Sequence, residues 1–70
     1  MGKRRTGIMV AYSQDANAGV IRGADGRKYL FFSRHWRSSE VPLLGEGVVF
    51  YALRKGRAAY VKVQTRNVEE

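Results

Sequence analysis

The chain of 70 residues has no cysteine, one proline and one histidine, and these scarcities exclude several kinds of protein. Without cysteine there is neither a disulfide nor a thiolate metal site, so the fold must be stabilised by packing alone. The single histidine, His35, has no second histidine beside which it could hold a metal, and we expect no metal and no cofactor. Apolar runs are far shorter than the ~20 residues that span a bilayer, and no secretion signal follows the basic start. We therefore expect a cytoplasmic protein without membrane association.

Acidic residues are also few, because 13 Lys and Arg face only 6 Asp and Glu, which gives a formal charge of +7. Setting aside the three basic residues at positions 3–5 and the two acidic residues at positions 69–70 still leaves +6 on the body of the chain. A domain this basic favours polyanions as partners. A chain of this length buries only about 60% of its unfolded surface, so we expect one small domain and exclude a two-domain enzyme.

Short apolar pieces separated by turn residues predict an all-β domain. The expected strands cover residues 6–13, 18–23, 28–33, 48–54 and 57–64. The step Asp25-Gly26 predicts a tight hairpin between the second and third strands, and Lys55-Gly56 predicts another between the last two. The longer connection between the third and fourth strands contains Pro42, which argues against a further strand there.

Five short antiparallel strands with one longer connection predict a five-stranded Greek-key barrel, because closure removes the exposed edges of a small sheet. An SH3-like barrel fits the pattern almost as well. We expect the barrel to cover residues 6–64, with a basic flexible arm at 1–5 and a flexible tail at 65–70. The large apolar area of Trp36 is expected to plug one end of the barrel, and His35 to be an ordinary loop imidazole.

The main uncertainty in the predicted surface is which side chains of the third strand face outward. Tyr29 and Phe31 alternate with Leu30 and Phe32, and only one of these pairs can belong to the core. We interpret Tyr29 and Phe31 as the outward pair, where two rings two residues apart suit the stacking of adjacent bases. By this interpretation, four rings remain outside the core: Tyr29, Phe31, Tyr51 and Tyr60.

The segment 7–21 (G-I-M-V-A-Y-S-Q-D-A-N-A-G-V-I), followed by Asp25-Gly26 and by Leu30 to Phe32, resembles the bacterial cold-shock domain. The resemblance covers residues 6–64 and consists mostly of glycines, turn residues and inward apolar positions. It implies an OB-type barrel that binds single-stranded RNA or DNA, with bases stacked on aromatic side chains of the first three strands beside a basic rim.

The departures from this family fall on its aromatic platform. Phe31 takes the aromatic position of the V-F-V-H signature, and Tyr12 takes another aromatic position at the end of the first strand. Four other ring positions hold smaller residues: Ala11, Ala18, Val20 and Ser33. Because each stacked base contributes ~1–3 kcal/mol, their loss weakens binding unless a ring such as Tyr29 compensates. The chain therefore resembles a divergent cold-shock domain whose binding surface is rebuilt or abandoned.

Two hypotheses of function follow. The first is weak, low-specificity binding of single-stranded RNA or DNA by a monomer. Its contacts are expected to be the rings of Tyr12, Tyr29 and Phe31 and the phosphate-binding side chains of Arg22, Arg27, Lys28, Arg34 and Lys62. The alternative is a cold-shock-like module used for contact with a protein partner through a patch of Ala11, Ala18, Val20 and Phe31. We expect no enzyme, because the serines and the one histidine lack a motif that positions a catalytic site.

Overall fold

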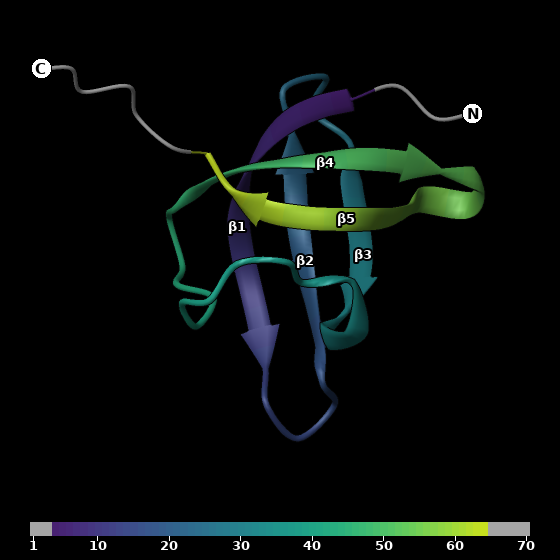
Figure 1. Cartoon of the computed structure of the whole chain (residues 1–70). Coiled ribbons are helices and arrows are strands. Elements are labelled where there is room, and N and C mark those ends of the chain that lie inside the picture. The colour runs from purple at the N-terminus through teal and green to yellow at the C-terminus, as the bar shows by residue number, and fades with distance from the viewer. Residues whose placement is uncertain (1–3, 65–70) are drawn as a thin grey trace, which may run out of the picture.

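The computed structural model describes residues 4–64, which form a closed barrel of five strands (Figure 1). The strands are β1 (Arg4–Ser13), β2 (Ala18–Gly23), β3 (Lys28–Phe32), β4 (Gly47–Leu53) and β5 (Arg57–Val63), with the short 3-10 helices η1 (Ser33–His35) and η2 (Arg54–Gly56). Their order around the barrel is β1-β2-β3-β5-β4. Neighbouring strands are antiparallel except β3 and β5, which are parallel. The predicted all-β, five-stranded barrel is confirmed.

The strand boundaries lie close to those predicted, and the start of β1 is the main correction. β2 has the predicted bounds, whereas β1 begins two residues earlier than expected. Arg4 pairs with Tyr51 and Arg5 with Phe50, so these two residues of the expected arm are part of the barrel. The rest of the expected arm, 1–3, and the expected tail, 65–70, lie outside the described residues.

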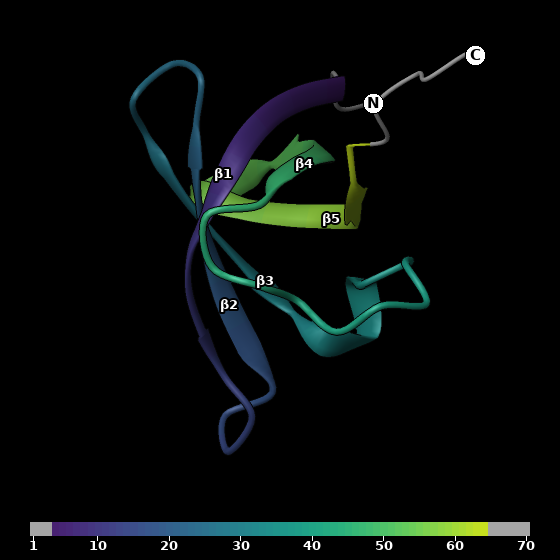
Figure 2. The same ribbon diagram turned by 90° about the vertical axis from the view of Figure 1, so that its left-hand side faces the viewer.

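β1 takes part in both halves of the barrel. Its first half pairs with β4 and its second half with β2, and the β4–β5 hairpin crosses over the β1–β2–β3 strands (Figures 1 and 2). The register between β1 and β2 shifts between Met9 and Ala11. Such a bulge bends a strand, and it helps β1 to pass from one half of the barrel to the other.

The core lies inside the ring of strands. Its largest fully buried side chains are Phe31, Phe50, Met9, Ile21, Val48 and Val61. Trp36 stacks on Phe31 with ring centroids 6.0 Å apart, and its indole N–H donates to the carbonyl of Glu40 at 2.7 Å. Trp36 also forms a parallel bridge with Val61 of β5. Trp36 therefore packs over the core, which is the structural role expected for it.

Both predicted hairpins are present. Gly26 has φ = +85°, a left-handed conformation that glycine adopts without steric cost, and the backbone N–H of Arg27 donates to Asp25 Oδ1 at 3.0 Å. The β4–β5 turn contains two consecutive left-handed residues, Lys55 and Gly56. These turns fix the register of the strands that they join.

Candidate nucleic-acid interface

Tyr29 and Phe31 belong to the core, so the prediction that their rings face solvent is wrong. Their exposed fractions are 6% and 0%. In the β2–β3 register, Tyr29 lies opposite the buried Ile21, and Phe31 lies opposite Gly19. A Cβ at Gly19 would come within 2.6 Å of the Phe31 ring, so glycine leaves the space that this ring fills. Since directly opposite residues share a face of the sheet, both rings point inward and neither can stack on a base.

Tyr12 lies at the edge of the core. Its half-buried ring stacks on that of Phe31, with centroids 6.3 Å apart and an angle of 20° between the planes. Tyr12 therefore packs against the core and is also part of the barrel surface.

The outer surface of β2 and β3 carries the opposite set of side chains. Three cross-strand pairs lie there: Ala18–Phe32, Val20–Leu30 and Arg22–Lys28. On the other side of β3, Leu30 pairs with Arg57 of β5. We define the Phe32 face as these six residues together with Arg34 and Arg57. It combines a partly exposed ring, two branched aliphatic side chains and four cations.

Phe32 is the ring of this face, and two guanidinium groups flank it. The Cζ of Arg34 lies 5.2 Å from its ring centroid and the Cζ of Arg57 lies 5.4 Å from it. Both distances are within the ~6 Å range of cation–π attraction. A base can stack on such a ring or on a guanidinium plane, and the cations can bind the adjoining phosphates.

The structure also bears on the two V-F-V-H positions assigned to this chain. On β3 the outward residues are Leu30 and Phe32, whereas Phe31 is fully buried and Ser33 begins η1. The aromatic position assigned to Phe31 therefore lies inside the barrel.

The structure gathers three of the five predicted phosphate-binding residues on the Phe32 face: Arg22, Lys28 and Arg34. Lys62 lies on β5 beside a different hollow, and Arg27 lies in the β2–β3 turn. Sequence reasoning missed Phe32, Leu30 and Arg57. The alternation in β3 already contained Leu30 and Phe32 as the other choice, whereas nothing local signals that Arg57 would meet β3.

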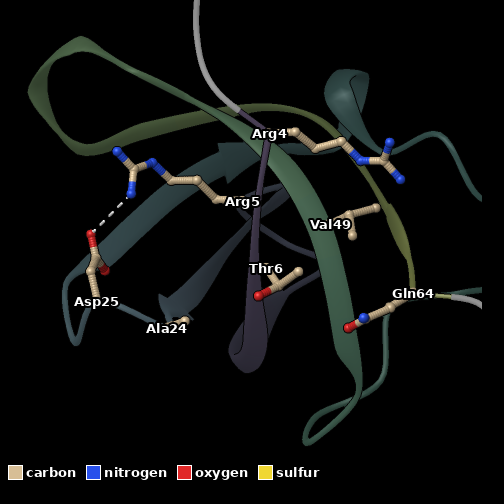
Figure 3. Close-up of a pocket in the computed structure, with 7 residues that line it drawn as sticks. All are labelled: Arg4, Arg5, Thr6, Ala24, Asp25, Val49 and Gln64. Carbon is tan, nitrogen blue, oxygen red and sulfur yellow. Dashed lines mark ion pairs between the residues drawn. The ribbon is translucent and has the colours of Figure 1, made fainter.

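A separate hollow of about 560 Å³ opens where the start of β1 meets the β2–β3 hairpin (Figure 3). It is lined by Arg4, Arg5, Thr6, Ala24, Asp25, Val49 and Gln64. Arg5 Nη1 lies 3.7 Å from Asp25 Oδ2, and the Tyr29 hydroxyl donates to the same oxygen at 2.7 Å. These contacts tie the hairpin to β1 and to the core. The hydrogen bond from Tyr29 lowers the pKa of Asp25, with help from the Arg27 N–H, and the same bond raises the pKa of Tyr29.

The stabilisation that the Tyr29–Asp25 hydrogen bond provides should be lost at both low and high pH. Because the folded Asp25 pKa is lowered, its contribution is present above its unfolded pKa of ~3.9 and is lost as pH falls through the folded pKa. Because the folded Tyr29 pKa is raised, its contribution is present below ~10 and is lost as pH rises through the folded pKa. Tyr29→Phe should therefore make the urea midpoint fall less steeply toward both acid and alkaline pH. Identical pH profiles for the two proteins would contradict this bond.

The residues that the structure describes hold no group of three or more His, Cys, Asp or Glu side chains placed to bind a metal ion. Neither of the two short helices found between residues 4 and 64 is long and apolar enough to cross a membrane.

Comparison with known proteins shows the fold. No protein-family model matches the chain, and no curated protein matches it. Among solved structures, the chain is similar to the Drosophila Unr segment CSD456, of cold-shock domains, with 18% sequence identity and a TM-score of 0.77. The match covers 99% of this chain and 30% of that one. The chain therefore folds as a cold-shock-like OB barrel, which confirms the predicted fold and decides against an SH3-like barrel.

Proposed function

We propose that this protein binds single-stranded nucleic acid through the Phe32 face, weakly and with little preference for sequence. The observation that carries the proposal is the partly exposed Phe32 ring with the guanidinium groups of Arg34 and Arg57 beside it, at 5.2 and 5.4 Å from its centroid. Every base has a π-face, so stacking on such a site tolerates any sequence. One flanked ring, in place of a platform of several, gives the low affinity.

The charge of the face supports the same ligand. Within residues 4–64, the ion pair that forms is Arg5–Asp25, so the four cations of the Phe32 face have no acidic partner. Unpaired cations can bind phosphates and release the counterions of a polyanion.

A protein-docking function has less support. The patch expected for it comprised Ala11, Ala18, Val20 and Phe31, and it loses its one ring because Phe31 is fully buried. What remains of it is small, and cations adjoin it. An apolar partner would have to cover these charges at a cost in desolvation.

The test is the substitution Phe32→Ala, with binding of a labelled oligothymidine followed by fluorescence anisotropy at low salt. Loss of a stacked base should raise Kd about 5- to 150-fold, which corresponds to ~1–3 kcal/mol. Phe32→Trp should keep the affinity because a ring remains.

The matched control is Leu44→Ala, which shortens a side chain that is 67% exposed and lies outside the face. Its Kd should equal that of the unmodified protein. Equal affinities of Phe32→Ala and Leu44→Ala, or no binding by the unmodified protein at low salt, would reject the proposal.

A further inference from the structure

A second surface of rings and cations lies outside β4 and β5. Tyr51 and Tyr60 are 38% and 58% exposed, and their rings meet edge to face with centroids 6.1 Å apart. A hollow of about 240 Å³ adjoins them. We call its lining the Tyr60 face: Arg4, Arg37, Val49, Phe50, Tyr51, Tyr60 and Lys62. The set contains three cations and no acidic side chain.

Three strands and one connection build this face. Arg4 of β1 pairs with Tyr51 of β4, and Tyr51 pairs with the neighbour of Tyr60 on β5. Arg37 follows η1, and its backbone N–H donates to the carbonyl of Val61 at 2.7 Å. Its Nη1 donates to the carbonyl of Arg34 at 2.7 Å, and its Cζ lies 5.1 Å from the Tyr60 ring centroid. The position of Arg37 over the ring is thus fixed by backbone contacts.

The backbone of Tyr60 is the second observation. Tyr60 has φ = +52°, whereas the other described residues with positive φ that are not glycine, Asn17 and Lys55, lie in turns. The register of β4 with β5 shifts at this point, between Val49 and Tyr51. A bulge can re-aim a side chain, and a left-handed conformation of a bulky residue is costly. The costly conformation occurs at the residue whose ring lies beneath the Arg37 guanidinium.

The Tyr60 face adjoins the Phe32 face. Arg57 and Tyr60 are three residues apart on β5, a rise of about 10 Å. In η1, Arg34 lies over Phe32, while the adjacent His35 has its ring centroid 6.4 Å from that of Tyr60. A single strand of nucleic acid that runs from Phe32 along β5 therefore reaches Tyr60 without crossing the barrel. OB folds cover about 4–16 nucleotides, more than one ring can hold.

We propose that the Tyr60 face is a second contact for the same single strand of nucleic acid. Tyr60 and Tyr51 hold a base, and the phosphates on either side of it bind the three cations of the face: Arg4, Arg37 and Lys62. The inference rests on the proposed function for its class of ligand, but its site is separate. It predicts that the strand bends around the barrel from β3 over β5.

The decisive variant is Tyr60→Asn, because asparagine tolerates positive φ better than tyrosine does. It removes the ring and should leave the melting temperature equal or higher. Its Kd for a labelled oligothymidine of about 12 nucleotides should rise about 5- to 150-fold, whereas Tyr60→Phe should keep the affinity. If Tyr60→Asn fails to fold, Lys62→Gln serves instead and should make the salt slope of binding shallower by about 0.7.

Parallel measurements on Phe32→Ala separate the two sites. Weaker binding by Phe32→Ala with unchanged binding by Tyr60→Asn would overturn the second contact and leave the proposed function standing. The reverse result would support the Tyr60 face and reject the Phe32 face. No effect of either variant would reject both. Full competition by thymidine monophosphate at an equal concentration would assign the Tyr60 face to free nucleotides and overturn the proposal of a strand.

Discussion

Replacing Phe31 by alanine should remove most of the stability of the barrel. The ring is fully buried between Tyr12 and Trp36, which stack on it at 6.3 and 6.0 Å. Such a truncation costs ~3–5 kcal/mol, whereas a chain of this length has a free energy of unfolding of about 4–10 kcal/mol. Urea denaturation followed by Trp36 fluorescence should show a large fall of the midpoint or no folded baseline.

The matched control is Phe32→Ala, which truncates the same kind of side chain one residue later. Its ring faces outward and is only partly buried, so the free energy of unfolding should fall much less. Phe31→Leu should restore part of the loss because it leaves a smaller cavity. Equal losses of stability for the two alanine variants would contradict the assignment of the faces.

Binding of single-stranded nucleic acid should fall steeply with salt. The four cations of the Phe32 face, each contacting one phosphate, contribute about −2.8 to the slope of log K against log salt, or about a 50-fold loss between about 50 and 200 mM. Titrations of a labelled oligothymidine at a series of salt concentrations measure this slope directly.

Charge removal should change the slope only where the strand lies. The double variant Arg34→Gln, Arg57→Gln should make it shallower by about 1.4. A control with the same loss of charge is Arg54→Gln, Lys55→Gln, in the exposed helix η2 and outside both faces. A slope near zero, or equal slopes for the two double variants, would show that the affinity does not come from phosphates at the Phe32 face.

The fold was predictable because its signals are local. The turn residues Asp25 and Gly26 mark one hairpin, and the bounds of β2 follow from the turns on either side. Short strands in a small chain then favour a closed barrel, since open edges are a liability. The resemblance to cold-shock domains pointed to the same architecture.

The facing of β3 was predicted wrongly because alternation fixes two faces without saying which one is inside. Tyr29 with Phe31 and Leu30 with Phe32 were equally apolar choices. The missing information was the register with β2, in which Ile21 lies opposite Tyr29. Ile21 is flanked by Val20 and by the charged Arg22, so its own facing could have been used to orient β3.

Other features of the candidate site depend on contacts between distant parts of the chain. Arg57 reaches Phe32 only because β5 lies parallel to β3, and no local pattern indicates that pairing. The left-handed backbone of Tyr60 arises where the register of β4 and β5 shifts, and tyrosine gives no hint of it. Tertiary structure decided both features.

The parallel seam between β3 and β5 has a consequence for how mutations on this side must be interpreted. The backbone pairing there consists of the pair Leu30–Arg57, extended by the bridge Trp36–Val61, so side-chain contacts supply much of the energy that keeps this seam closed. Segments with few backbone hydrogen bonds open locally at the lowest free-energy cost. The contact between Phe32 and Arg57 therefore helps to close the barrel and also forms part of the proposed ligand surface. The loss of affinity caused by a substitution at either residue will include the free-energy cost of keeping the β3–β5 seam closed.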